Sequence, residues 1–333
     1  MRDTPATGPV LAGASPAPGA QPDDRVLLIL AADHRNSLER DLYGLTAPPT
    51  PAQAAQISAD KLLVYQALLG AVRQLPAGVQ PGMLIDEQYG ASVAELASRS
   101  AGAVSLCMPV EASGEEWFCF AYGDDWQRHA GFFAAEHTKV LVRDNPGLDP
   151  GLRERQAHQL AQVSAWAAAA SRSLIVELLV PATDADKEAT AGSTDRYDDE
   201  LRPGHTLKVM EYLQDRGVEP AIWTVEGLDR HDDAVAVAAM AVRAGRQARC
   251  VVLGRHVPHG KLDHWLQVAA PVPGWTGFAI GRSIWWDALR AHRHHRCTVG
   301  EARRRISVAY LDYARYYLAA RDGMLAGEPD PEL

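Results

Sequence analysis

Short apolar runs alternate with amphipathic stretches along almost the whole chain, and this alternation restricts the fold more than any other sequence feature. The first run, 26–32, is continuously apolar, as strands covered on both faces are, and charged residues follow it. Further strands are expected at 82–85, 103–109, 137–144, 174–180, 221–226, 250–253 and 277–280. Helices are expected at 52–73, 92–100, 152–170, 205–216, 234–243 and 299–320.

About eight strand–helix units in series over some 300 residues predict a single (β/α)8 barrel domain over 25–325. No glycine-rich dinucleotide fingerprint follows any of the strands, which argues against an open, doubly wound sheet. Residues 1–24 are rich in Ala, Pro, Gly and Asp and are expected to form a disordered leader. The polar segment 181–203 is longer than most connections and is expected to be a lid or binding loop.

Composition excludes several classes of function. The chain has 33 Lys or Arg and 42 Asp or Glu, and its formal net charge of -9 argues against a nucleic-acid-binding surface. No apolar run approaches the roughly 20 residues of a membrane span, so no membrane association is expected. The four cysteines form no Cys-x-x-Cys pair and no secretory signal is seen. We therefore expect a cytoplasmic protein with reduced cysteines.

Lys139 lies inside the short β-branched run that ends at Asp144, where a charged amine is costly to bury. The chain has only five lysines, at 61, 139, 187, 208 and 261, and its other basic residues are arginines. Because arginine cannot lose its proton and a buried amine can, a lysine kept in a strand suggests a functional role. The alternative is a structural lysine that is ion-paired inside the barrel.

Four charged residues lie on or directly after four different strands: Asp33, Asp86, Lys139 and Glu177. Barrel closure would bring them together. A desolvated lysine with a lowered pKa attacks a ketone as the free amine, while a carboxylic acid shuttles protons during imine formation and carbon–carbon cleavage. The same residues could instead form a satisfied ion-pair network. We expect the catalytic role.

The last two strands are followed by glycine and arginine, where barrels often bind phosphate. Glycine lets backbone N–H groups approach an anion, a helix start adds positive potential, and arginine clamps oxygens. The expected phosphate ligands are Gly254, Arg255, Gly281, Arg282 and Ser283. The histidine-rich segment 292–297 is read as a solvated helix terminus, so no metal site is expected, and no cofactor either.

Several ordered motifs carry a resemblance to a known group of enzymes. They are Asp33-His34-Arg35, Asp86-Glu87-Gln88-Tyr89-Gly90, Lys139-Val140-Leu141-Val142, Glu177 with Pro181, Trp223-Thr224-Val225-Glu226 and Gly281-Arg282-Ser283-Ile284. Together they resemble the aldolase-like domain behind the sugar kinase in bacterial myo-inositol catabolism proteins and, more distantly, class I tagatose 1,6-bisphosphate aldolases. The resemblance covers about 26–320 and implies a (β/α)8 barrel that splits a phosphorylated keto sugar. An example is 2-deoxy-5-keto-gluconate 6-phosphate, giving dihydroxyacetone phosphate and malonate semialdehyde.

The resemblance also implies roles for individual residues. Asp33 would position or protonate the substrate, Lys139 would assist at the reacting carbons, and Glu177 would be the acid/base group. Arg282 would hold phosphate. Asp86 joins the catalytic candidates, and the expected substrate-binding residues are His34, Arg35, Glu87, Trp223, Thr224 and Glu226.

One position departs from the family pattern. The family's Schiff-base lysine lies on strand six, where this chain has Thr224, and threonine cannot form an imine. Three hypotheses follow: an aldolase in which Lys139 is the imine lysine, an isomerase, epimerase or non-covalent lyase, and a non-catalytic sugar-phosphate binder. In all three the expected partner is a small sugar phosphate. The tyrosine-rich last helix makes a homo-oligomer plausible.

Overall fold

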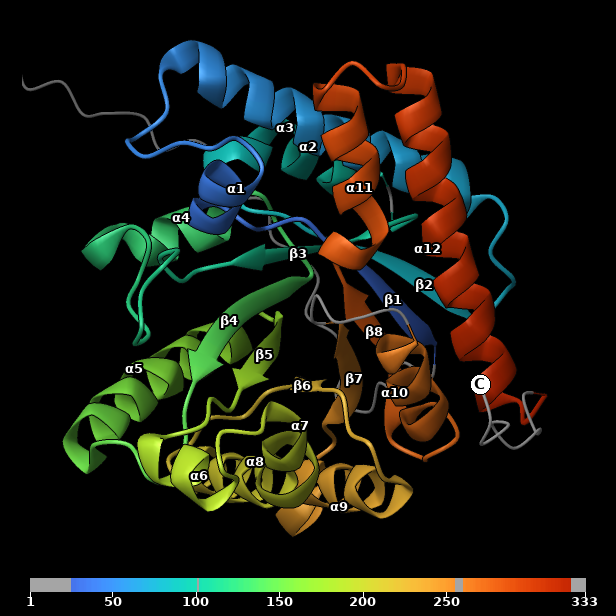
Figure 1. The fold of residues 1–333 in the computed structure, drawn as a ribbon. Helices are drawn as coiled ribbons and strands as arrows, with labels where there is room; N and C mark the ends of the chain where they lie inside the picture. The colour runs from blue at the N-terminus through green and yellow to red at the C-terminus, as the bar shows by residue number, and fades with distance from the viewer. Residues whose placement is uncertain (1–24, 101, 255–259, 325–333) are drawn as a thin grey trace, which may run out of the picture.

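A closed barrel of parallel strands forms the centre of the computed structural model, which describes residues 25–100, 102–254 and 260–324 (Figure 1). The strands are β1 (Val26–Ala31), β2 (Val79–Leu84), β3 (Ser105–Pro109), β4 (His137–Arg143), β5 (Ser173–Leu179), β6 (Ile222–Glu226), β7 (Arg249–Gly254) and β8 (Trp275–Ile280). Each strand pairs with the next one in the sequence, and β8 pairs with β1 to close the barrel. The expected (β/α)8 barrel is confirmed. The expected leader, 1–24, lies outside the described residues.

Helices surround the barrel (Figure 1). They are α1 (Asn36–Asp41), α2 (Pro51–Val72), α3 (Glu87–Ser98), α4 (Trp126–Phe132), α5 (Pro150–Ala169), α6 (Asp184–Ala189), α7 (Thr194–Arg196), α8 (Arg202–Gln214), α9 (His231–Ala241), α10 (Lys261–Ala269), α11 (Arg282–Arg293) and α12 (Val299–Arg321). Short 3-10 turns, η1 (Gly123–Asp125) and η3 (Arg243–Gly245), and a π-helical turn, η2 (Tyr197–Leu201), complete the described elements.

The strands are apolar on both faces because each face is buried against a different layer. Inward side chains, among them Leu27, Ile29, Ile175 and Val251, form a small core inside the barrel. Outward side chains pack against the helices in a larger core. Since side chains alternate along a strand, Lys139 and Glu177 share the inward face of β4 and β5 with the small core. Polar groups therefore replace apolar ones inside the barrel near the carboxyl ends of the strands.

Local capping explains where several helices begin. Thr50 accepts a hydrogen bond from Gln53 N–H and the Gln53 side chain accepts one from Thr50 N–H, which makes a capping box before α2. Asp149 caps α5 in a similar way, through Leu152 N–H. Proline occupies the first turn of both helices, where its missing N–H costs nothing.

The segment 181–203 differs from the expected open loop. It contains α6, α7, η2 and the start of α8. Its polar residues bond to one another and to the barrel. Asp186 accepts hydrogen bonds from Thr183 N–H and from Asn145 Nδ2, the second at 3.0 Å. The other oxygen of Asp186 lies 3.0 Å from His205 Nε2. The expected loop is wrong in conformation, because the segment is largely helical and its polar side chains bond within the protein, whereas a role as a lid or binding element stays a prediction.

The last helix, α12, packs against α2 and α11 and contributes tyrosines to the core (Figure 1). Tyr310 donates its hydroxyl hydrogen to Leu28 O at 2.8 Å, and Tyr317 donates to Trp275 O at 3.1 Å. These tyrosines therefore tie the helix layer to β1 and β8, whereas a homo-oligomer through this helix stays a prediction. Within the described residues, no helix is both long enough and apolar enough to cross a membrane.

Candidate active site

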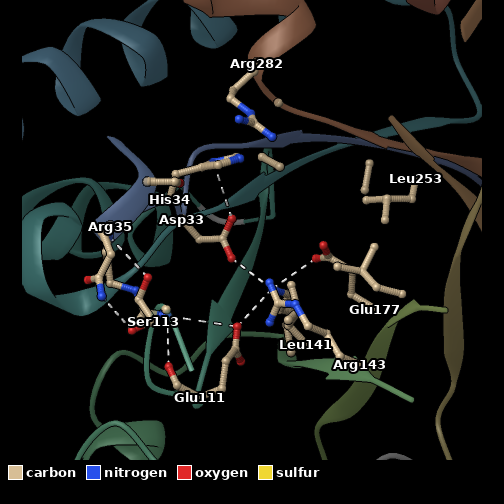
Figure 2. Close-up of a pocket in the computed structure, with 18 of the residues that line it drawn as sticks. Asp33, His34, Arg35, Glu111, Ser113, Leu141, Arg143, Glu177, Leu253 and Arg282 are labelled. Atoms are coloured by element: carbon tan, nitrogen blue, oxygen red, sulfur yellow. Dashed lines mark hydrogen bonds and ion pairs between the residues drawn. The ribbon is translucent and has the colours of Figure 1, made fainter. Parts of the chain in front are cut away.

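A cavity of about 490 Å³ lies at the carboxyl ends of the strands, where barrel enzymes place their chemistry. Its lining comes from β1, β4, β5, β7 and β8, from the segments after β1, β3 and β8, and from α1 (Figure 2). Of the residues expected at the site, those that line the cavity are Asp33, His34, Arg35, Lys139, Glu177, Gly254, Gly281 and Arg282. Sequence reasoning did not include Glu111, Ser113, Arg40 and Arg143, which line it as well.

The Lys139 ammonium lies at the base of this cavity among three carboxylates. Its Nζ is 3.0 Å from Asp33 Oδ2, 2.9 Å from Glu111 Oε1 and 3.0 Å from Glu177 Oε2. These partners come from the ends of β1 and β3 and from β5, as Figure 2 shows. Only 2% of the Lys139 side chain is exposed, so the ion pairs are largely shielded from water.

The carboxylates determine the protonation of this lysine. Burial alone would lower the pKa of Lys139, but Asp33, Glu111 and Glu177 outweigh it and raise that pKa well above its ordinary value. The expectation of a lysine with a lowered pKa is therefore wrong, because the amine does not stand alone in its apolar strand. In this ground state Lys139 is an ammonium ion.

The carboxyl groups of Asp33 and Glu177 are pushed in opposite directions. Burial would raise the pKa of Asp33, but the charge of Lys139 holds it well below its usual range. Burial raises the pKa of Glu177, and the attraction of Lys139 does not offset this. A pair of carboxyl groups with diverging pKa values is typical of acid/base catalysis, since one stays ionised while the other is more readily protonated.

His34 presents a neutral imidazole to the cavity. Burial lowers the pKa of His34 to about 4, although the neighbouring Asp33 carboxylate acts in the opposite direction. The ring stands edge-on to Trp285, with ring centroids 5.5 Å apart. Its backbone carbonyl accepts a hydrogen bond from Lys61 Nζ at 2.9 Å. The hydrogen bond from Lys61 therefore ties the loop after β1 to α2.

The guanidinium of Arg282 lies across the cavity from Glu111 (Figure 2). Arg282 is the first residue of α11, follows Gly281 and makes no hydrogen bond or ion pair with any residue that the structure describes. A Cβ at Gly281 would lie 2.6 Å from Ala31 O, so only glycine lets β8 pass this close to β1. A guanidinium beside a helix start is typical of anion sites, and phosphate binding by Arg282 stays a prediction. The expected ligand Arg255 lies outside the described residues.

Asp86, expected to be catalytic, has a structural position instead. It is fully buried, caps α3 by accepting a hydrogen bond from Tyr89 N–H at 2.8 Å, and forms an ion pair with Lys61. It does not line the cavity. The reason is that β2 is followed at once by α3, so the carboxylate turns to the helix start and to the Lys61 amine rather than to the barrel axis.

Other expected substrate-binding residues also lie away from the cavity lining. Trp223 points outward into the core between barrel and helices. Glu226 accepts a hydrogen bond from Val180 N–H at 2.9 Å, and Glu87 pairs with His129 Nδ1 at 2.8 Å. Ser283 follows Arg282 in α11 without reaching the lining.

Thr224 occupies the strand-six position at which the resembled family has its imine lysine. It pairs in register with Glu177 and shares the inward face of β6. It is 1% exposed, and its hydroxyl has no hydrogen-bond partner among the described residues. The side chain thus lies in the barrel beneath the cavity lining, and the position is occupied by a group that cannot form an imine.

Glu111 is the functional candidate that sequence reasoning left out. The signal was present, because Glu111 follows the third predicted strand as Asp33 follows the first.

Among the described residues, no group of three or more His, Cys, Asp or Glu side chains is placed to hold a metal ion. The segment 292–297 contains the end of α11 and the turn after it.

Comparisons with known proteins give a family and a fold. The family DUF2090, described as an uncharacterized protein conserved in bacteria, matches residues 17–321. Fructose-bisphosphate aldolase from Plasmodium falciparum superposes with a TM-score of 0.59 at 14% identity, over 92% of this chain and 94% of that one. The protein Cgl0159 from Corynebacterium glutamicum gives 0.53 at 16% identity, over 88% and 87%. No curated protein sequence matches the chain.

A third solved structure, of a Schiff base-forming fructose-1,6-bisphosphate aldolase, superposes with a TM-score of 0.50 at 13% identity, over 88% of this chain and 94% of that one. At these identities the superpositions establish a shared fold, the (β/α)8 barrel. The activity of this chain depends on its own cavity side chains.

Proposed function

The chain belongs to the DUF2090 family, and from the chemistry of its cavity we propose that it is a carbon–carbon lyase acting on a phosphorylated keto sugar or keto sugar acid. We further propose that the reaction runs without an imine. The observation that carries this proposal is the Lys139 ammonium held by three carboxylates at the base of a cavity that is also lined by Arg282, which has no ion-pair partner among the described residues. The inositol-catabolism or tagatose type of substrate belongs to the proposal.

Each group has a definite part in the proposed retro-aldol step. Arg282 and the start of α11 bind the phosphate. Glu177, as the carboxylate, takes the proton of the substrate's β-hydroxyl, and the bond between the α- and β-carbons breaks. The electron pair moves to the carbonyl oxygen, and the enolate that forms is stabilised by the Lys139 ammonium. A proton then returns to the α-carbon and completes the second product.

The alternative of Lys139 as imine nucleophile requires a neutral amine. Three carboxylates at 2.9–3.0 Å favour the ammonium, so they support the non-covalent route. Imine formation would require the substrate to displace one of these carboxylates, and borohydride trapping detects that route.

An isomerase or epimerase is the second candidate, and His34 is the observation that favours it. A neutral imidazole beside a cation and a carboxylate can polarise a carbonyl while the carboxylate moves a proton at the adjacent carbon. This reaction also passes through an enolate, which forms by loss of an α-proton and keeps every carbon of the substrate, whereas the lyase enolate belongs to the cleaved fragment. The two differ in whether a carbon–carbon bond breaks.

Incubation with dihydroxyacetone phosphate in D2O, followed by proton NMR, tests the proposal. We expect exchange of an α-proton, and condensation once malonate semialdehyde is added. With borohydride we expect no covalent adduct, and Lys139→Met should abolish exchange. Exchange without condensation on any added aldehyde would favour the isomerase. Binding without exchange would leave a sugar-phosphate binder, and an adduct on Lys139 would contradict the non-covalent route.

A further inference from the structure

Glu111 is held rigidly beside Lys139. Its backbone forms an isolated bridge with Phe120, and its carbonyl accepts a hydrogen bond from Arg35 Nη2 at 2.8 Å. About 7% of its side chain is exposed. With this backbone fixed, the carboxylate has little freedom to leave the ammonium 2.9 Å from its Oε1.

The other carboxylate oxygen of Glu111 is unusual. Glu111 Oε2 is buried and has no hydrogen-bond partner among the described residues. Besides Lys139, the cation beside this carboxylate is Arg35, whose Nη2 is 4.0 Å from Oε1. A buried carboxylate that satisfies only one oxygen is costly. Its ionic interaction with Lys139 is therefore the contact that accounts for its place in the cavity.

The groups that face Lys139 come from all the elements around it. Asp33 and Glu177 are the other anions, from the end of β1 and from β5. His34 and Arg35 stand in the loop after β1, and Thr224 faces inward from β6 without charge. Asp33 and Glu177 also have expected roles with the substrate. Glu111 is the carboxylate for which the proposed reaction has no separate use.

We propose that Glu111 is a positioning residue that keeps Lys139 as an ammonium ion and so commits the site to non-covalent chemistry. Only the link to non-covalent chemistry rests on the proposed function. The effect on the amine itself belongs to this chain and needs no substrate.

Reductive methylation tests the amine directly. In this reaction Lys139 attacks formaldehyde, water leaves to form an imine, and cyanoborohydride supplies the hydride that reduces it. Only the free amine attacks, so the rate follows the free-amine fraction, which changes tenfold for one unit of pKa. We expect Glu111→Gln to speed methylation of Lys139 at least about tenfold at pH 8, measured by peptide mass spectrometry.

Internal and matched controls are available in the same chain. The exposed Lys187 reports general reactivity and should react equally in both proteins. Glu116→Gln neutralises an exposed carboxylate in the loop after β3 and should leave Lys139 unchanged. Glu111→Asp keeps the charge and should keep most of the protection. An unchanged rate in folded Glu111→Gln would overturn the inference.

A measurement on the wild type covers the case in which Glu111→Gln does not fold. Lys139 should then be methylated more slowly than Lys187 across pH 7–9, and an equal rate would overturn the inference.

Where Glu111→Gln does fold, incubation with dihydroxyacetone phosphate and borohydride should give this variant an adduct on Lys139 that the wild type lacks. Absence of α-proton exchange in the wild type, with Lys139 still protected, would instead refute the proposed function and leave the inference standing.

Discussion

The loop after β1 brings an ionised carboxylate, a neutral imidazole and a buried guanidinium into three consecutive positions, Asp33, His34 and Arg35. Their protonation follows from different neighbours. Lys139 keeps Asp33 ionised, whereas burial keeps His34 neutral. At the residue scale, then, the environment of each side chain determines its chemistry more than its type does.

His34 predicts a pH dependence of stability. Its pKa falls from 6.5 to about 4 on folding, so below pH 6.5 the unfolded chain binds more protons at this residue than the folded one. The stability present above pH 6.5 is therefore lost as pH falls towards 4. We expect wild type to lose about 2–3 kcal/mol relative to His34→Asn between pH 6.5 and 4, measured by urea unfolding.

An exposed histidine provides the control for this comparison. His158→Asn should follow the wild-type pH dependence, because its side chain is open to water. The pKa of Asp33 is lowered from its ordinary value of 3.8, so its contribution to the pH dependence of stability lies below the range of pH 6.5 to 4. A constant difference between wild type and His34→Asn from pH 6.5 to 4 would contradict a buried neutral imidazole.

At the scale of elements, α2 supports the cavity from outside the barrel. Lys61 reaches from α2 to both Asp86, at the start of α3, and the His34 carbonyl, after β1. Burial lowers the pKa of Lys61, and Asp86 opposes this. Three elements therefore meet at one buried ammonium, and the loop that carries Asp33 depends on it.

A double-mutant cycle tests this connection. Lys61→Met and Asp86→Asn should each cost about 3–5 kcal/mol of unfolding free energy, because each leaves a buried charge unpaired. The double variant should cost at least about 1 kcal/mol less than the sum. The exposed pair Lys187 and Asp184 is the control, and its two substitutions should be additive because water screens the charges. Additive losses at Lys61 and Asp86 would contradict the ion pair.

The inward face of β6 gives a second prediction at this scale. A lysine at 224 would lie beside Glu177 and near the Lys139 ammonium, which disfavours a second positive charge and lowers the new lysine's pKa. We expect Thr224→Lys to gain a borohydride-reduced adduct with dihydroxyacetone phosphate at residue 224, detected by peptide mapping. Thr224→Met, of similar length without an amine, should show none. A folded but unreactive Thr224→Lys would mean that this position does not reach the cavity.

At the scale of the whole molecule, barrel closure joins groups that lie far apart in the sequence. Asp33 and Arg282 are separated by almost the whole barrel in sequence, yet both line one cavity (Figure 2). β8 reaches β1 at Gly281, where a larger residue would meet the Ala31 carbonyl. The closure of the fold and the position of Arg282 in the cavity lining therefore depend on the same contact.

Arg282 predicts the strength of phosphate binding. A hydrogen bond to a charged group contributes about 1.5–3 kcal/mol, so Arg282→Gln should raise the Kd for dihydroxyacetone phosphate about 10–100-fold by isothermal titration calorimetry. Arg290→Gln, on the exposed side of α11, should leave the Kd unchanged. Unchanged binding in Arg282→Gln would place the phosphate elsewhere in the cavity.

Most of the barrel could be predicted from local pattern. Continuous apolar runs arise because β1 to β8 are buried on both faces, and capping residues such as Thr50 and Asp149 mark helix starts. Segment 181–203 could not be predicted, since its polar residues, among them Asp186, bond to groups far along the chain. Trp223 was misplaced because an apolar run does not reveal which alternate residues face inward.

The sequence by itself determined the order of strands and helices, the low lysine content and the presence of threonine at 224, because these are properties of residue type and spacing. Only the tertiary structure decided that Asp86 turns to Lys61 and that Glu111 joins Asp33 and Glu177 around Lys139. The physical reason is that protonation depends on burial and on charges within a few ångströms, and closure of the barrel sets those distances.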